Sequence, residues 1–259
     1  MLNTAPERLL KAMPAGRRPP HALRIAVTGF GPFPGVPFNA SERLVRDLAK
    51  APPRLPSGAR LYVAALPTDW RLAMEALTEL MEETRPHVAL HFGVSVWASG
   101  FVVETRAFNQ TSTRPDCSGR LALERCVRRR APVTVRTKLP AARLVQRLRM
   151  EGIAARLSAD AGRYLCNAVM FQSVCRAERG SSPQASRAWR QEALSAVGGN
   201  IPDLSDGPMA GFVHIPALGS DAAQHASGFG WPELRRGADV ILDTLARLAH
   251  GRIRQHRRR

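Results

Sequence analysis

The chain has 259 residues, of which 44% are hydrophobic, and a formal net charge of +17. This length suffices for one large buried core, and no apolar run approaches the roughly 18 residues that cross a bilayer. The charge suggests a nucleic-acid partner, but most of the basic residues are scattered arginines. The two dense basic runs, residues 128–130 and 251–259, contain no Phe, Tyr or Trp on which bases could stack. We therefore expect no obligate nucleic acid and no membrane as a partner.

The distribution of charged and apolar residues divides the chain into three parts. Residues 1–22 are a polar, basic arm that we expect to be flexible, and they lack the apolar segment of a signal peptide. Residues 23–250 contain the alternating apolar segments of a single α/β domain. Within this domain, residues 176–208 are rich in Ser, Gly, Gln and Arg and indicate a polar insertion. Residues 251–259 form a basic tail.

The cysteines include no closely spaced pair. They are Cys117, Cys126, Cys166 and Cys175. This spacing predicts neither a zinc cluster nor a disulfide framework, and we expect no cofactor. Free thiols persist in a reducing environment, so we expect a cytoplasmic localisation.

In the first half of the chain, short apolar runs alternate with amphipathic ones. Three runs bounded by Gly or Pro predict buried strands: residues 24–30, 61–67 and 87–94. Residues 41–50 and 70–85 have the apolar spacing of helices, and Asn39 or Ser41 can cap the first of them. A loop rich in Pro and Gly joins the first strand to the first helix and contains Phe33.

In the second half the pattern is less regular. Residues 99–109 and 133–140 predict extended structure, and residues 111–120 between them are rich in turn formers. Later segments predict a helix that ends at Gly152, a strand and turn, an apolar helix, a strand and a closing helix: residues 141–152, 153–162, 167–177, 211–217 and 230–250.

Strands that alternate with amphipathic helices predict a three-layer α/β/α sandwich with a mostly parallel, twisted sheet. In such folds the chemistry lies at the carboxyl ends of the strands. Three notable residues fall near those ends: Phe33, Cys166 and His214.

Cys166 has the position of a nucleophile, because it lies in or just before the first turn of its predicted helix. The positive end of a helix and a neighbouring imidazole both favour the reactive thiolate. Cys175 lies more than two turns further on and is better interpreted as a packing residue. The alternative for Cys166 is the same, since free cysteines are among the most buried residues.

His214 is the candidate base, although a histidine in an apolar strand is more often a satisfied core residue. Other histidines compete for the role: His87, His91, His225 and His250. Glu104 stands in a run that otherwise looks buried, and an unpaired buried carboxylate is costly. It therefore needs a partner, for which an imidazole N–H is suitable.

Four segments together resemble the pyroglutamyl-peptidase I family of cysteine exopeptidases, which remove N-terminal pyroglutamate. They are TGFGPFPG with NAS following, HFGVSVWASGFVVETRAFN, AGRYLCN and GFVHIPALG, in family order from about residue 24 to residue 246. The resemblance implies a phosphorylase/hydrolase-like fold and a Cys–His–Glu triad of Cys166, His214 and Glu104. It implies a thioester intermediate and pyroglutamyl peptides as substrates.

The resemblance also implies a substrate pocket. Phe33 and Tyr164 would enclose the lactam ring, Phe30 would line the same wall, and Asn39 would support the loop. Many bacterial members carry a Gln and a Gly-Gly-Arg before the glutamate, where this chain has Val94 and SVWASG. Either the backbone near Val94 takes over that contact with the lactam, or the contact is absent.

Two further points come from the resemblance. Arg106 occupies the place of a basic residue that could assist the oxyanion, and residues 176–208 lengthen the interval between the cysteine and the histidine.

Family members include both monomers and tetramers, so a homo-oligomer is an open alternative. Two other functions stay open: a related cysteine amidohydrolase of altered specificity, and a basic protein that binds nucleic acid.

Overall fold

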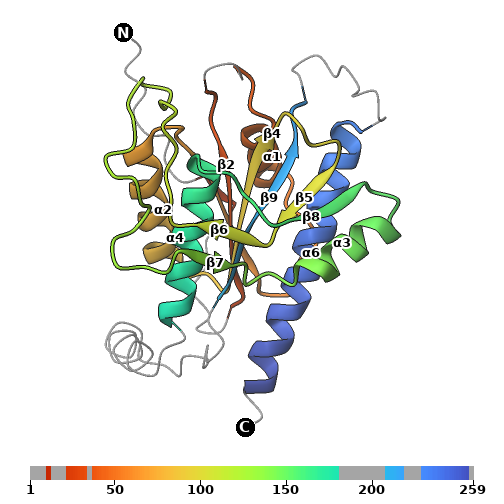
Figure 1. Ribbon diagram of the computed structural model, residues 1–259. Helices are drawn as coiled ribbons and strands as arrows, with labels where there is room; N and C mark the ends of the chain where they lie inside the picture. Colours follow the sequence, from red (N-terminus) through yellow and green to blue (C-terminus); the bar gives the residue numbers. More distant parts are fainter. Residues whose placement is uncertain (1–9, 13–21, 34–36, 181–207, 219–228, 257–259) are drawn as a thin grey trace.

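The structure is a computed structural model that describes residues 10–12, 22–33, 37–180, 208–218 and 229–256. Within these ranges the core is a seven-stranded sheet in the order β1-β3-β2-β4-β9-β5-β8, with helices on both faces (Figure 1). Its strands are β1 (Leu10–Ala12), β2 (Arg24–Phe30), β3 (Arg60–Leu66), β4 (Val88–Ser95), β5 (Phe101–Glu104), β8 (Ala155–Ser158) and β9 (Met209–Pro216). A two-stranded sheet joins β6 (Arg106–Phe108) to β7 (Thr134–Arg136).

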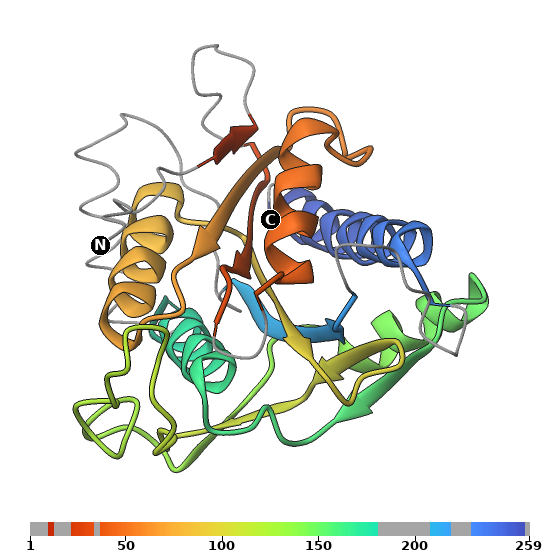
Figure 2. The same ribbon diagram turned by 90° about the horizontal axis from the view of Figure 1, so that it is seen from above.

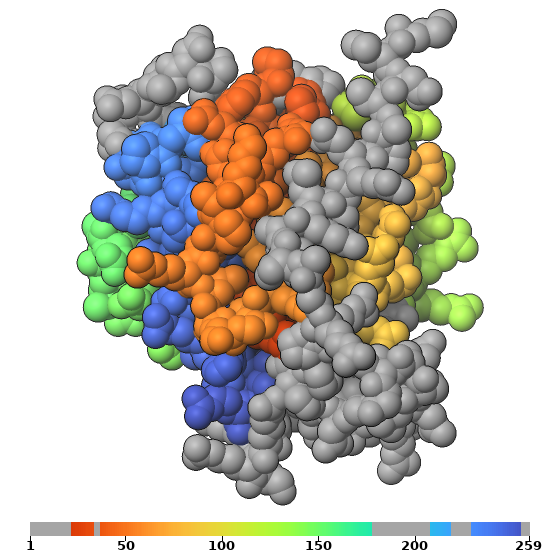
Figure 3. Space-filling view, turned by 180° about the vertical axis from the view of Figure 1, so that it is seen from behind, coloured from red at the N-terminus to blue at the C-terminus, as the bar shows by residue number. Residues whose placement is uncertain are grey.

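The described helices form two layers, one on each face of the sheet (Figure 2). They are α1 (Ala40–Lys50), α2 (Trp70–Thr84), α3 (Ala141–Met150), α4 (Leu165–Gly180) and α6 (Trp231–His256). Apolar side chains of α1, α3 and α6 form one core with the sheet, and those of α2 and α4 form the other. On the first face, Arg235 of α6 donates a hydrogen bond to the Asp47 carbonyl of α1 at 3.2 Å, and Figure 3 views α6 (blue) beside the orange segment that contains α1.

The centre of the sheet is parallel, since β3, β2, β4 and β9 run in one direction. β1 is antiparallel to β3, and β5 is antiparallel to β9. The predicted three-layer α/β/α sandwich with a mostly parallel sheet is therefore confirmed. Strands buried on both faces are near-continuous apolar runs, as in β2, where only Arg24 is not fully buried.

The first two helices begin at side chains that accept hydrogen bonds from free N–H groups. Asn39 caps α1 and accepts from the Ser41 backbone N–H at 3.0 Å. Asp69 caps α2 and accepts from the N–H groups of Arg71 and Leu72 at 2.9 and 2.8 Å. Asn39, one of the two predicted caps, thus fixes the start of α1 directly after the Pro/Gly-rich loop.

Two segments predicted as single units are divided or extended in the structure. The predicted strand at residues 99–109 separates into β5 and β6, because the N–H and hydroxyl of Thr105 both donate to the Ser158 carbonyl at 2.7 Å. The strand predicted at residues 87–94 begins at Val88 and continues one residue further, to Ser95, paired with β9.

Three of the predicted boundaries differ from the structure. Residues 10–12 of the expected N-terminal arm pair with the edge of β3 as β1. Residues 176–180 of the expected insertion continue α4, and the rest of it, apart from Pro208, lies outside the described residues. The expected tail at residue 251 is helical to His256, because Ile253 still packs in the core.

The position of β9 brings the site together. This strand lies between β4 and β5, with Gly93 on one side of His214 and Val102 on the other. The connection from β4 to β5 must therefore pass over the carboxyl end of β9, as Figure 1 shows.

Candidate active site

Cys166 is the second residue of α4, so its sulfur lies at the positive end of a helix. The strand beside it leaves room only for glycine. A Cβ atom at Gly93 would lie 3.0 Å from the Cys166 sulfur and 2.6 Å from Cζ of Phe212. Gly93 thus allows the thiol to approach the backbone of β4 closely, and any side chain there would displace it.

His214 connects the thiol to a buried acid. Its Nδ1 lies 2.8 Å from Oε1 of Glu104, which is only 2% exposed, and the ring also hydrogen bonds to Cys166. Burial by itself lowers the pKa of His214, but the hydrogen bonds to Cys166 and Glu104 and the charges of both raise it to about 9. At neutral pH the ring therefore holds a proton, and a protonated imidazole stabilises a neighbouring thiolate.

Only one of the two carboxylate oxygens of Glu104 has a described hydrogen bond. Its Oε2 is buried and has no hydrogen-bond partner among the described residues, whereas Oε1 binds His214. A carboxylate whose one described bond goes to Nδ1 fixes the ring orientation and leaves Nε2 for chemistry. The three predicted triad residues thus form one hydrogen-bonded chain.

The other described histidines have structural surroundings. His87 accepts from the Arg24 N–H at 3.0 Å, and His91 lies 2.8 Å from the Thr28 hydroxyl. Burial lowers the pKa of each to about 3, with a further contribution at His87 from the charge of Arg24. Both rings stay neutral in the core and cannot exchange protons at neutral pH. His250 lies on α6, and His225 falls outside the described residues.

Phe30 and Asn39 hold the loop after β2. The amide of Asn39 donates to the Gly31 carbonyl at 2.8 Å, and the Ser41 hydroxyl accepts from the Phe30 N–H at 2.9 Å. Phe30 is 3% exposed and its ring centroid lies 6.3 Å from that of Phe212, so it belongs mainly to the core. Phe33 is half-buried and presents more of its ring.

Tyr164 is fixed at two points. Its hydroxyl donates to the Pro115 carbonyl at 3.0 Å, and its ring packs edge-on against Trp70, with centroids 5.2 Å apart. Burial raises the pKa of Tyr164, as do the charges of nearby groups that include Cys166. The structure therefore places Tyr164 within electrostatic range of the thiol.

Thr68 links the two proposed walls of the pocket, a role that the sequence pattern did not indicate. Its hydroxyl donates to the Pro32 carbonyl, and its own carbonyl accepts from the Cys117 N–H at 3.0 Å. The Phe33 loop and the Pro115 turn that holds Tyr164 are thus bonded to the same residue. A threonine after a strand and Pro67 gave no sequence signal of this role.

Asn167 is a second residue that the sequence analysis missed. It is fully buried, accepts from the Phe108 N–H at 2.7 Å, and donates to the carbonyls of Phe108 and Gln110 at 2.8 and 2.9 Å. These bonds fasten the first turn of α4 to β6. The asparagine directly after Cys166 in YLCN was the available signal, since a buried amide needs several partners.

Two predicted residues have weaker connections. Val94 is partly buried and directly follows Gly93, the residue of β4 that lies beside the thiol. Arg106 lies in β6 opposite Arg136, and none of the contacts described for this part of the chain joins it to Cys166 or His214.

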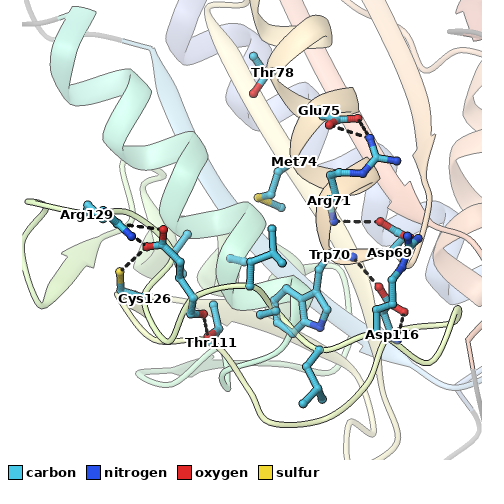
Figure 4. A pocket seen from close by; sticks show the side chains of 17 residues that line it. Asp69, Trp70, Arg71, Met74, Glu75, Thr78, Thr111, Asp116, Cys126 and Arg129 are labelled. Atoms are coloured by element: carbon cyan, nitrogen blue, oxygen red, sulfur yellow. Dashed lines mark hydrogen bonds and ion pairs between the residues drawn. The ribbon is translucent and has the colours of Figure 1, made fainter.

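A separate cavity of about 600 Å³ lies between α2, the segment of residues 111–129 and Ala168 of α4. Figure 4 shows Met74 and Trp70 inside it and the Arg71–Glu75 pair at its edge. Arg129 pairs with Glu124 on the opposite side at 2.9 Å. Neither Cys166 nor His214 lines this cavity, but Trp70 connects it to Tyr164.

Two classes of site do not occur in the described ranges. The described residues contain no group of three or more His, Cys, Asp or Glu side chains that could hold a metal ion. They also contain no helix with the length and hydropathy of a membrane span. The four cysteines, all of which the structure describes, are free thiols.

A thiol, an imidazole and a carboxylate in hydrogen-bonded order, at the carboxyl edge of an α/β sheet, define the class of cysteine hydrolases. The sequence model of a family described as "Pyroglutamyl peptidase" matches residues 23–188. The chain belongs to this pyroglutamyl peptidase family.

Individual relatives agree with this assignment. The chain is 29% identical over 197 residues to a pyrrolidone-carboxylate peptidase of Pyrococcus furiosus, covering 76% of this chain and 82% of the relative. It is 30% identical over 158 residues to one of Streptococcus suis, covering 61% and 72%. A solved mutant pyrrolidone carboxyl peptidase of P. furiosus superimposes with a TM-score of 0.66 at 26% identity, covering 87% of this chain and 99% of that one. Pyroglutamyl peptidase I of Bacillus amyloliquefaciens shares the fold, with a TM-score of 0.67 at 22% identity and coverage of 87% and 97%.

Proposed function

We propose that the protein hydrolyses the amide bond between an N-terminal pyroglutamate and the next residue of a peptide. Cys166 is the nucleophile, His214 the general acid and base, and Glu104 the residue that orients the imidazole. One observation carries the proposal: in a member of this family, His214 bonds both to Cys166 at the start of α4 and to the buried carboxylate of Glu104.

In the first half of the reaction, the Cys166 thiolate attacks the pyroglutamyl carbonyl carbon and forms a tetrahedral oxyanion. The imidazolium of His214 then gives its proton to the leaving nitrogen, the C–N bond breaks, and the peptide leaves with a free amine. In the second half, His214 takes a proton from water, whose oxygen attacks the thioester. The C–S bond breaks, pyroglutamate is released, and the thiolate and imidazolium are restored.

The oxyanion needs N–H donors, and we assign this role to backbone N–H groups at the start of α4. The side chain of Asn167 supports the assignment, because it fastens this turn to β6. Arg106 is a subordinate candidate. An Arg106→Ala variant that keeps its kcat would remove it from this role.

The lactam of pyroglutamate is flat and uncharged, so its site needs apolar faces and a few hydrogen-bond partners in the ring plane. We propose that Phe33 and Tyr164 supply the faces and the backbone near Val94 a polar contact. Asn39 supports the Phe33 loop through the Gly31 carbonyl. Phe30, being almost fully buried, would contribute only the floor of this wall.

The test is release of a chromogenic amine from a pyroglutamyl amide. We expect Cys166→Ser to abolish the release, by a factor of about a thousand or more, because the alcohol is a far weaker nucleophile than the thiolate. Cys126→Ser is the matched control for a cysteine outside the site and should keep wild-type rates. Full activity in Cys166→Ser would overturn the proposal.

Three further points concern the substrate class, the compartment and the assembly of the enzyme. Turnover of other acyl amides, with none of pyroglutamyl amides, would favour the related amidohydrolase instead. A nucleophilic thiol must stay reduced, so we propose that the enzyme works in a reducing compartment, which is consistent with the cytoplasm. The homo-oligomer stays a prediction, to be tested by sedimentation.

A further inference from the structure

The connection from β4 to β5 carries an exposed tryptophan over the catalytic strand. β9 lies between β4 and β5, so residues 96–100 cross its carboxyl end, two residues beyond His214 (Figure 1). Trp97 in this connection is 87% exposed and its neighbour Val96 is 56% exposed. A tryptophan is a large apolar surface to leave in water, and its place in the connection that crosses β9 calls for an explanation.

The connection is anchored at both of its ends. At the first end, the Ala98 N–H donates to the Ser95 carbonyl at 3.1 Å, and Ala98 is buried. At the second end, a Cβ on Gly100 would lie 2.4 Å from the Ala154 carbonyl oxygen, so the backbones are in close contact. The Phe101 N–H also donates to that carbonyl at 2.9 Å. Trp97 is therefore presented on an anchored turn.

The proposed reaction fixes where the leaving peptide begins. Since His214 protonates the leaving nitrogen, the residue after pyroglutamate begins beside its ring. One extended residue spans about 3.5 Å, and an aromatic side chain extends about as far again, so the first residue after pyroglutamate reaches about 7 Å from that point. The end of β9 is about the same distance beyond His214, two residues at about 3.3 Å each. A large side chain at this position is therefore long enough to reach the turn that carries Trp97.

We propose that Trp97 is a specificity-determining residue, which binds the apolar or aromatic side chain that directly follows pyroglutamate. The inference rests on the proposed function and extends it to the leaving peptide. Residues 95–100 contain no charged side chain, so the surface offers an aromatic face without an ionic partner. An uncharged apolar or aromatic side chain matches it best.

The experiment compares two substrates, pyroglutamyl-phenylalanine amide and pyroglutamyl-glycine amide, by the amine released. In Trp97→Ala we expect kcat/KM for the phenylalanine substrate to fall about three- to tenfold, the effect of one aromatic pair. The loss should appear in KM, because this contact forms equally in the bound substrate and the transition state. The glycine substrate should change less than twofold, and Trp97→Phe should keep most of the preference.

Met150→Ala is the matched control, because Met150 is another exposed apolar side chain, 67% exposed, at the end of α3. This variant should leave kcat/KM unchanged for both substrates. An equal loss with both substrates, which leaves the ratio of their kcat/KM values unchanged, would overturn the inference. If the mass of Trp97→Ala in sedimentation were also lower, Trp97 would instead be assigned to contact with a second copy of the chain.

The two proposals fail in different ways. Wild-type enzyme that releases glycine amide, while Cys166→Ser does not, supports the pyroglutamyl peptidase function whatever Trp97 does. A wild type without activity on either substrate refutes the function, and with it the inference that depends on it.

Discussion

Two buried carboxylates have opposite surroundings. Asp116 is 1% exposed and accepts four hydrogen bonds, from the N–H groups of Trp70, Ser118 and Arg120 and from the Ser118 hydroxyl. Glu104 is 2% exposed and accepts one described bond, from the ring of His214. Burial raises the pKa of Asp116, but its hydrogen bonds outweigh burial and lower it overall.

The difference distinguishes a structural acid from the acid that we propose to be catalytic. A carboxylate whose lone pairs are all used holds a turn in place and has nothing left to offer a reaction. A carboxylate that is bonded mainly to an imidazole holds a proton carrier and stabilises its charge. Exchanging each acid for its amide should therefore produce opposite results, loss of catalysis in one case and loss of structure in the other.

The largest effect is expected for Glu104→Gln. The amide cannot stabilise the imidazolium and can hold the ring in the wrong tautomer, so kcat should fall by about 10² to 10⁴. The free energy of unfolding, measured above about pH 9 so that the charge of His214 does not contribute, should change little, because the replaced oxygen Oε2 has no described partner. Kinetics and urea unfolding of the same preparation test both halves. A stable variant with wild-type kcat would show that Glu104 has no catalytic role.

The next largest effect is expected in the pH dependence of kcat/KM, which the protonation of His214 should control. In the folded protein the pKa of His214 is raised from 6.5 to about 9. The protonated ring therefore stabilises the folded protein, fully below pH 6.5, and this stabilisation is lost as the pH rises through about 9. We expect kcat/KM to fall about tenfold per pH unit above that value, since the imidazolium then no longer protonates the leaving amine.

The matching change tests the cause of the shift. In Glu104→Gln the falling limb should move toward the ordinary pKa of 6.5, because the attraction of one charge is removed. The measured value belongs to the coupled Cys166–His214 pair. A limb that stays at the same pH in both enzymes would exclude Glu104 as a source of the shift.

A smaller effect on catalysis and a larger one on stability are expected for Asp116→Asn. Oδ1 can keep its bonds to Ser118 and Arg120, but an amide nitrogen would face the Trp70 N–H in place of Oδ2. The unsatisfied donor should cost about 1–3 kcal/mol in the free energy of unfolding.

The kinetic signature of this variant should also be specific. Trp70 packs against Tyr164, so KM should rise several-fold while kcat stays close to that of the wild type. Thermal unfolding and steady-state kinetics measure the two effects. A fall in kcat comparable to that of Glu104→Gln would remove the distinction between the two acids.

The two carboxylates also show how far the sequence could be interpreted. The strand at residues 24–30, the capped helix after it and the helix that begins near Cys166 follow local patterns, and the structure confirms them. Glu104 was recognisable as a buried acid that needs a partner. Asp116, in a turn-rich stretch, was not, because its four donors converge only after the turn folds.

The approach of Cys166 to His214 could be predicted only from the family resemblance. The insertion of β9 between β4 and β5 is a long-range pairing that no local pattern encodes. The same holds for Gly93, whose missing side chain makes room for a sulfur that lies far away in the sequence. Thr68 and the extension of α4 to Gly180 likewise depend on contacts that form after the chain has folded.

The smallest effect is expected for Tyr164→Phe, which separates the contribution of the hydroxyl from that of the ring. Tyr164→Phe removes the hydrogen bond to the Pro115 carbonyl but keeps the ring against Trp70, so it should cost about 0.5–1.5 kcal/mol of stability and change KM less than about threefold. Tyr164→Ala removes the proposed wall of the lactam site and should raise KM well beyond that. If Tyr164→Phe instead lowered kcat as strongly as Glu104→Gln, the hydroxyl would take part in the chemistry. Asp116 would then support a catalytic group through the turn, and its difference from Glu104 would be one of distance rather than of kind.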